Sequence, residues 1–276
     1  MGNTLVIARK EFEDLFSNKL VIIIIVVYVA MILMKLYSYY RNILSYGFYP
    51  GDSVLSLLSV WVDVVVLYGS AVATVIGVAS IANERSSHAL NTLLVKPLYR
   101  DTIINGKLIG VMAFMSCVLG LVAALYVSSI FILLGSQVSS FIGAFLAWVP
   151  PFFVLSIIAA SISLLLSMLI SILVKEQYYA LFLSVLSWIM LNLYVCSVCF
   201  AQNIAVLFGA SRNAMEAFLG ELSPVGSLNC IILYVSDTDN ALRVLSAYSG
   251  VIIRLALLAV VLLVLNYVTF LRRDVQ

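Results

Sequence analysis

Few residues of this chain have the type and spacing that catalysis requires. The one histidine, His88, has no second metal ligand near it in a charged segment. Gly106-Lys107 looks like the end of a phosphate-binding loop, but Asp101 stands where the upstream glycine should be, and Leu108 replaces Ser or Thr. One loop histidine and scattered serines cannot supply a nucleophile–histidine–acid set. The sequence therefore predicts no catalytic, metal or cofactor site on this chain.

Two charged residues stand inside otherwise apolar runs, and such residues are candidate functional sites. A lone carboxylate near the middle of a bilayer costs roughly 3 kcal/mol, so Asp63 needs a partner, a polar cavity or a proton. Arg254 lies about a turn into the last apolar run, and its long side chain can reach the interface. Asp63 and Arg254 are thus candidates for an intramembrane polar site, in which they either pair or line a path.

A scaffold built for lipid must position these residues. Of 276 residues, 64% are hydrophobic and 10% are charged, and the mean hydropathy is +1.15. Soluble domains carry about 25% charged residues, and no soluble fold of this size hides so much apolar surface, whereas a bilayer solvates it. The net charge of +2 offers no basic surface for nucleic acid. We therefore expect an all-α integral membrane protein, not a soluble enzyme.

Apolar runs and their polar boundaries predict six transmembrane helices within a single transmembrane domain, residues 1–276. The spans are expected at about 20–37, 54–83, 108–134, 141–174, 178–208 and 251–270, the fourth with a break near Pro150 and Pro151. Residues 4–19 precede them and carry Leu5, Ala8, Phe12, Leu15 and Phe16 on one face. This pattern predicts an amphipathic helix that lies in the membrane interface.

The distribution of Lys and Arg predicts the orientation. If both termini lie on one side, that side carries ten of the 15 basic residues, the other side carries four, and the last span carries one. Both termini are therefore expected to be cytoplasmic in a multi-pass protein of the cell membrane. Residues 84–107 then form a cytoplasmic segment, and residues 209–250 form an external one.

The cytoplasmic segment 84–107 is too polar for lipid and too apolar for a flexible linker. Leu90, Leu93 and Leu94 form a one-sided stripe, and Pro97 interrupts the chain before a second short helix that begins at Arg100. An apolar stripe exposed outside the bilayer needs a cover. The segment is either a solvated helical hairpin or a docking element for a cytoplasmic partner.

This segment resembles the cytoplasmic loop between spans two and three of type-2 ABC exporter permeases. That loop shows an acidic–basic pair, a leucine run, a proline, an arginine three residues later, and a Gly-Lys pair that opens the next span. The matching residues here are Glu84, Arg85, Leu90, Leu93, Leu94, Pro97, Arg100, Gly106 and Lys107. The chain departs at His88-Ala89, where the family commonly has Gly-Thr, and Leu222-Ser223-Pro224 is a weaker match in the external segment.

The resemblance implies the permease subunit of an ATP-driven exporter. A separate cytoplasmic ABC ATPase subunit would bind the ATP and would dock on the entry helix and on the segment 84–107. A second permease chain, identical or different, would pair with this one in the bilayer, and spans two and five would line the path. Residues of the segment would then couple ATP-driven movement of the ATPase to the spans.

Other functions stay open on the sequence alone. An ion- or proton-coupled secondary transporter would use Asp63 as its ion site, although the two halves show no inverted repeat. A membrane-embedded enzyme would need ionisable residues clustered at one depth. A non-transporting membrane assembly protein is compatible with the same layout. No residue selects a transported substrate.

Overall fold

The computed structural model describes residues 2–46, 53–86, 100–138, 141–174, 176–195, 197–209, 211–232 and 241–272, and these ranges are almost entirely helical. In chain order the helices are α1 (Gly2–Ser17), α2 (Lys19–Tyr46), α3 (Ser53–Trp61), the π-helical η1 (Val62–Leu67), α4 (Tyr68–Ser86), α6 (Arg100–Val138), α7 (Ile142–Leu173), α8 (Gln177–Ile189), the π-helical η2 (Met190–Tyr194), α9 (Val198–Phe208), α10 (Arg212–Leu222), α11 (Pro224–Ile232), α12 (Ala241–Ala247) and α13 (Ser249–Arg272).

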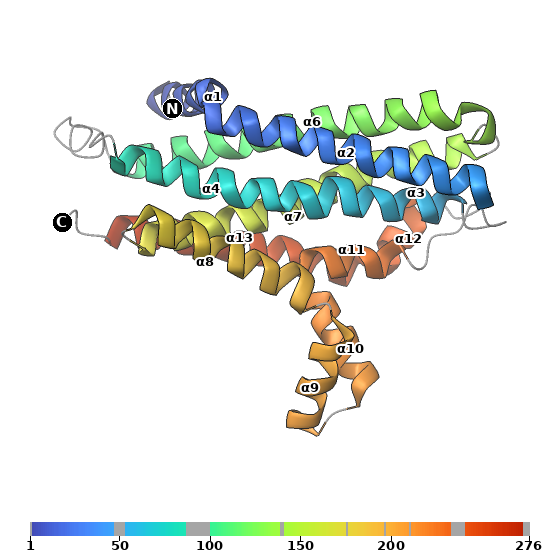
Figure 1. Cartoon of the computed structure of the whole chain (residues 1–276). Coiled ribbons are helices and arrows are strands. Elements are labelled where there is room, and N and C mark those ends of the chain that lie inside the picture. The colour runs from blue at the N-terminus through green and yellow to red at the C-terminus, as the bar shows by residue number, and fades with distance from the viewer. Residues whose placement is uncertain are drawn as a thin grey trace.

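Among the described residues, 5 helical segments are long and apolar enough to cross a membrane. They are Lys19–Tyr46, Val54–Ile81, Ile104–Gly135, Ile142–Leu173 and Ser249–Phe270. They run side by side as one bundle, and α8 lies along it (Figure 1). Both ends of the chain lie at the same end of the bundle as the end of α4 and the start of α6 (Figure 1). The protein is thus an all-helical, multi-pass membrane protein.

α7 is central to this bundle and packs against α4, α6, α8 and α13. Small side chains let α4 approach it closely, since a Cβ on Gly77 would collide with the Ser167 hydroxyl and the Leu164 carbonyl. From the other side, Asn266 of α13 donates a hydrogen bond to the Leu165 carbonyl at 2.8 Å. Small residues and interhelical hydrogen bonds hold helices together where lipid provides no hydrophobic driving force.

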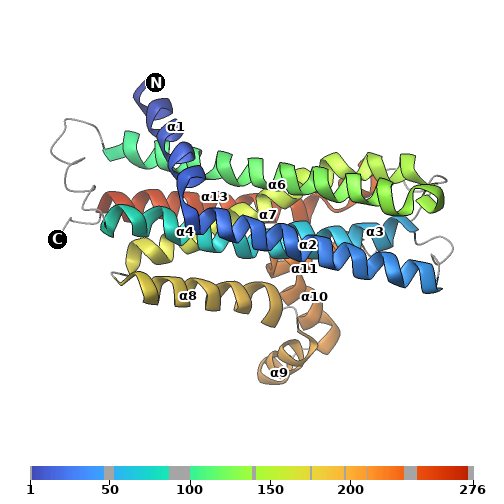
Figure 2. The same cartoon turned by 45° about the horizontal axis from the view of Figure 1, so that its top comes forward.

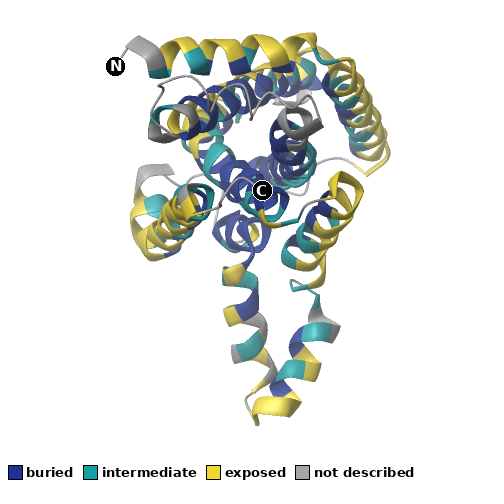
Figure 3. Ribbon diagram, turned by 90° about the vertical axis from the view of Figure 1, so that its left-hand side faces the viewer, coloured by how far each residue is buried: buried dark blue, intermediate teal, exposed yellow. Residues whose placement is uncertain are grey.

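The outer helices present apolar side chains away from the core, as a lipid-facing surface requires. In the most apolar part of α2, and likewise of α13, only 22% of the residues are buried inside the protein. In the most apolar part of the span Val54–Ile81, which runs through α3, η1 and α4, the share is 72%. Viewed from the end that holds the termini, buried residues fill the centre and exposed residues ring the bundle (Figure 3). The second predicted span is therefore enclosed by protein, and the first and the last face lipid.

Two expected interruptions are not present. α7 continues through Pro150 and Pro151, which leave the carbonyls of Leu146 and Ala147 without helical partners. Both of these residues are exposed in the first turns of α7, so the bilayer interface can hydrate their carbonyls. The short helix expected from Arg100 is the beginning of a continuous α6 of 39 residues.

The fifth predicted span, 178–208, is divided in two by the structure. α8 and η2 end at Tyr194, and α9 begins at Val198, where the Ser197 hydroxyl accepts a hydrogen bond from the Phe200 amide at 3.3 Å. α9 and α10 form an arm that projects from the bundle (Figures 1 and 3). A left-handed Gly209, with φ of 63°, ends α9. The span is shorter than expected because the chain leaves the bundle early.

The segment 209–250, expected to be external, also contains a helix packed inside the bundle. Most residues of α11 are buried, from Pro224 to Leu228 and again at Ile231 and Ile232. Ser223 starts this helix by accepting a hydrogen bond from the Gly226 amide at 3.3 Å. The motif Leu222-Ser223-Pro224 thus marks the point where the chain turns back from the arm into the bundle.

Candidate functional site

The predicted coupling segment 84–107 is described only at its two ends. Glu84 and Arg85 lie in the last turn of α4, and Arg100 is the first residue of α6. Leu90, Leu93, Leu94 and Pro97 lie outside the described residues. Gly106 and Lys107 are described in full, and both lie in α6 beneath α1. The described part of the candidate site is therefore the contact between α1 and the start of α6.

α1 lies directly across the first turns of α6 (Figure 2). Two glycines one helical turn apart make the close approach possible. A Cβ on Gly106 would lie 2.8 Å from the Ile7 side chain, and a Cβ on Gly110 would lie 2.5 Å from the Ala8 carbonyl. Gly106 and Gly110 thus form the small-xxx-small pattern that lets helix backbones touch. We call the contact of Thr4–Leu15 with Gly106–Phe114 the α1–α6 crossing.

A buried ion pair lies within the α1–α6 crossing. Nζ of Lys107 is 3.1 Å from Oε2 of Glu11, and their side chains are 1% and 10% exposed. Neither charge is tolerated there alone, because an unpaired buried ion costs several kcal/mol in desolvation. The pair therefore fixes the rotation and the position of α1 along α6.

Aromatic rings close the crossing on the side of the bundle. Phe114 of α6 packs edge-on against Phe12 and Phe16 of α1, with ring centroids 5.8 Å and 5.0 Å apart. Edge-to-face contacts of this kind contribute about 0.5–1.5 kcal/mol beyond the area they bury. The two glycines, the ion pair and the aromatic rings therefore hold α1 and the start of α6 together as one rigid unit.

The other face of α1 is exposed and highly charged. Arg9 donates to Glu13 at 2.7 Å, and Lys10 lies 4.0 Å from Asp14. The hydrogen bond and the charge of Glu13 raise the pKa of the exposed Arg9 guanidinium above its ordinary value. This face can meet water or a polar partner, whereas the opposite face belongs to α6.

The structure separates Asp63 from Arg254 and gives each residue its own partner. Asp63 lies in η1, where Oδ2 is 2.9 Å from Nζ of Lys35 in α2, and their side chains are 44% and 40% exposed. Arg254 of α13 pairs with Glu221 of α10. The two charges do not form a joint intramembrane site.

The π-helical turn η1 leaves backbone carbonyls without α-helical partners, a feature often found at functional sites. The buried hydroxyl of Tyr28 in α2 donates to the Val64 carbonyl at 3.0 Å. A Cβ on Gly69 would lie 3.0 Å from the same hydroxyl, so a larger residue there would displace it. α2 therefore holds the second span through the hydroxyl of Tyr28, through the hydroxyl of Tyr39, which lies 3.0 Å from the Ser56 hydroxyl, and through the Lys35–Asp63 ion pair.

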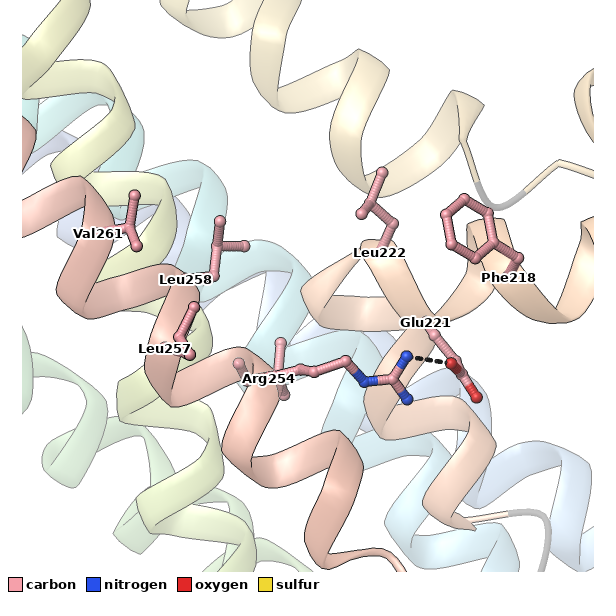
Figure 4. A pocket seen from close by; sticks show the side chains of 8 residues that line it. Phe218, Glu221, Leu222, Arg254, Leu257, Leu258 and Val261 are labelled. Atoms are coloured by element: carbon pink, nitrogen blue, oxygen red, sulfur yellow. Dashed lines mark hydrogen bonds and ion pairs between the residues drawn. The ribbon is translucent and has the colours of Figure 1, made fainter.

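Arg254 and Glu221 stand at the mouth of an apolar pocket of about 270 Å³ between α10 and α13 (Figure 4). Its walls are Phe218 and Leu222 from α10, and Leu255, Leu257, Leu258 and Val261 from α13. Within the described ranges, no three His, Cys, Asp or Glu side chains form a metal-binding group. The pocket suits an apolar or amphiphilic molecule.

Sequence reasoning missed four residues that contact or accompany the predicted ones, which are Glu11, Gly110, Lys35 and Glu221. Gly110 carried a signal, since it repeats Gly106 at a spacing of four. Glu11 and Lys107 are 96 residues apart in the chain, and Glu221 and Arg254 are 33 apart. Pairing over such separations depends on how the helices pack, and a single sequence does not encode it in its spacing.

The long apolar helices define a polytopic membrane protein. Residues 5–275 match the family described as ABC-2 family transporter protein. The chain therefore belongs to the ABC-2 family of transporter proteins and is a transmembrane permease of the ABC transporter class. This confirms the family predicted from the segment 84–107. A comparison with curated proteins gives no match.

Proposed function

We propose that this chain is the permease subunit of an ATP-driven ABC exporter in the cell membrane, with both termini in the cytoplasm. α8 with η2 is the fifth span in chain order and brings the number of spans to six. A second permease chain completes the translocation path, and a separate ABC ATPase subunit binds and hydrolyses the ATP. The observation that carries the proposal is the α1–α6 crossing, which lies at the end of the bundle where the segment 84–107 leaves and returns.

The crossing is stiff enough to transmit movement to the spans. α6 runs for 39 residues without interruption from Arg100 to Val138. At 1.5 Å per residue, a movement at its start is carried over about 58 Å, which exceeds the thickness of the hydrocarbon core. α1 adds a second lever, because the buried Glu11–Lys107 pair prevents it from moving without α6. Force applied by a partner to 84–107 or to α1 therefore reaches the spans.

The rival proton-coupled transporter receives less support. Its ion site would be Asp63, whose carboxylate is already 2.9 Å from the Lys35 ammonium. A carboxylate that is already engaged by a cation of the protein is a poor site for an imported ion. Transport that follows the proton gradient and persists without ATP would favour the rival.

The proposal is tested by capture of the ATPase. Tagged protein purified gently from its native membrane should retain ATP hydrolysis, and a stringent wash that leaves the chain alone should remove it. Leu93→Asp and Leu94→Asp should remove the associated ATPase, because loss of a buried anchor costs about 2 kcal/mol or more. Arg100→Glu should have a smaller, salt-dependent effect.

Asn91→Asp is the matched control, since it adds the same charge to the same segment outside the leucine stripe. Membrane insertion and thermal stability are measured for every variant. Normal ATPase capture by Leu93→Asp would refute the docking assignment. ATP turnover that survives stringent purification in proportion to this chain would refute the division of labour between permease and ATPase.

A further inference from the structure

The pocket between α10 and α13 has walls and a mouth of different chemistry. Five apolar side chains visible in Figure 4 line its length, namely Phe218, Leu222, Leu257, Leu258 and Val261. Phe218, Leu222 and Leu257 are each at least half exposed, so the pocket opens sideways toward the membrane. Its volume of about 270 Å³ lies just below the range of about 300–1,000 Å³ for sites that enclose a whole small molecule. It fits part of one acyl chain of a larger amphiphile.

The position of the pocket along α13 places its mouth at the depth of lipid headgroups. Arg254 lies five residues after Ser249, the first residue of α13, and the other end of α13 lies at the end of the bundle that holds the termini. At 1.5 Å per residue, Arg254 lies about 8 Å from that helix end, and Val261 lies about 10 Å deeper. Arginine at this depth reaches the interface, and the walls beyond it extend into the hydrocarbon.

The charges at the mouth are paired, but they are not enclosed. The side chains of Arg254 and Glu221 are 53% and 34% exposed. Among the residues that the structure describes, Glu221 engages one nitrogen of the guanidinium, which leaves most of its five N–H donors for a ligand. A pair of this exposure is weakly held, so a ligand that offers both opposite charges can replace it at little cost.

We propose that this pocket binds one zwitterionic aminophospholipid, phosphatidylethanolamine, from the bilayer leaflet at the end opposite the termini. The phosphate accepts hydrogen bonds from Arg254, and the primary ammonium donates to Glu221, so every charge keeps an opposite partner. One acyl chain lies along Leu257, Leu258 and Val261. An anionic lipid fits less well, because its headgroup leaves the Glu221 carboxylate beside the phosphate with no cation of the ligand to balance it.

Native mass spectrometry of the purified full-length chain tests this directly. The probes are dioleoyl lipids with ethanolamine, choline and glycerol headgroups, each titrated separately. Phosphatidylethanolamine should bind most tightly, because choline lacks N–H donors for Glu221 and glycerol lacks the cation. Arg254→Gln should weaken phosphatidylethanolamine binding roughly fivefold, the factor that corresponds to about 1 kcal/mol for one arginine near the membrane surface.

Glu221→Gln is the more decisive variant, because it should raise the affinity for one lipid, whereas the other variants should only lower affinities. With the carboxylate removed, phosphatidylglycerol should bind more tightly than in the wild-type protein, and the preference for ethanolamine should be lost. Leu258→Trp should fill the pocket and lower the affinity for all three lipids. Val261→Phe gives the same test should Leu258→Trp fail to fold.

The matched controls are Arg243→Gln, which removes an exposed arginine outside the pocket, and Leu263→Trp, which adds the same bulk to an exposed position on the face of α13 opposite the pocket. Both should leave lipid binding unchanged. Equal binding of the three headgroups to the wild-type protein would overturn the proposal. Equal losses in Arg254→Gln and Arg243→Gln, or an unchanged headgroup preference in Glu221→Gln, would overturn it as well.

Discussion

The two ends of this molecule each hold an ion pair that joins helices distant in sequence, and the two pairs differ in burial. At the end that holds the termini, Lys107 and Glu11 are 1% and 10% exposed. At the opposite end, Arg254 and Glu221 are 53% and 34% exposed. A buried pair cannot exchange partners without stranding a charge, whereas an exposed pair can. The first pair therefore suits a fixed joint, and the second suits a binding site.

The space around each pair supports the same distinction. In the α1–α6 crossing, a single methyl group added at Gly106 or Gly110 would meet backbone atoms within 3 Å. Between α10 and α13, the structure leaves a pocket of about 270 Å³. Close packing holds one arrangement, because a displaced helix would lose its contacts and leave a void. An open pocket leaves room for a ligand and for small movements of its walls.

Removal of one partner of the buried pair should have the largest effect on stability. Lys107→Met or Glu11→Gln should lower the free energy of unfolding by about 3–5 kcal/mol, because each breaks an ion pair in the protein interior. Chemical unfolding in mixed micelles gives the measurement.

Glu13→Gln is the control for this prediction, since Arg9 and Glu13 form an exposed pair on the same helix with side chains that are 81% and 60% exposed. Its cost should be far smaller, because exposed ion pairs on a helix contribute little to stability. The double change Glu11→Gln with Lys107→Met should recover part of the loss. Strictly additive losses would show that the two residues do not act as a pair.

Enlargement of the glycine contact should have the next largest effect. Gly110→Ala places a methyl group 2.5 Å from the Ala8 carbonyl, and overpacking of this kind costs about 1–3 kcal/mol. We expect α1 to shift along α6 and ATPase coupling to fall. Gly135→Ala is the control on the same helix, because nothing lies within 4 Å of its added Cβ. Alanine there should be neutral or stabilising by up to about 1 kcal/mol. Equal effects of the two changes would refute the close crossing.

Much of the helical layout follows from the sequence, because burial in lipid is a property of whole runs of residues. Hydropathy predicts the long helices, and the leucine and proline pattern of 84–107 predicts the family. The end of η2 at Tyr194 escaped prediction, since neither proline nor glycine marks it. Asn192 there is almost fully buried and donates to the Trp188 carbonyl at 3.2 Å, yet it reads in the sequence as one polar residue in an apolar run.

The ion pairs show the same limit. The sequence placed Asp63 and Arg254 in apolar spans, and it left open whether the two residues pair with each other or line a path. In the structure each has another partner, Lys35 for Asp63 and Glu221 for Arg254. The need for a counter-charge follows from a single residue and its depth. The identity of the counter-charge follows from helix packing, which hydropathy does not determine.

A third prediction concerns the joint between α2 and the second span, which is intermediate between the two ends. Tyr28→Phe removes the hydroxyl that donates to the Val64 carbonyl in η1. A buried carbonyl left without its donor costs about 1–3 kcal/mol. Tyr37→Phe is the control, because Tyr37 is exposed on the same helix and should change stability by less than about 0.5 kcal/mol. Equal stability of the two variants would show that η1 does not depend on Tyr28.

The smallest effect on stability should come from the exposed pair, and it separates the two ends most clearly. Arg254→Gln or Glu221→Gln should each change the unfolding free energy by less than about 1 kcal/mol, because exposed pairs typically contribute about 0–1 kcal/mol. The same two changes should alter lipid preference, whereas the much more destabilising Glu11→Gln should leave lipid preference intact in the protein that remains folded. Parallel unfolding and lipid titrations on the three variants measure both properties. If Glu221→Gln destabilises the protein as much as Glu11→Gln does, the Arg254–Glu221 pair is a structural joint like the Lys107–Glu11 pair. The contrast between a fixed end and an open end would then be wrong.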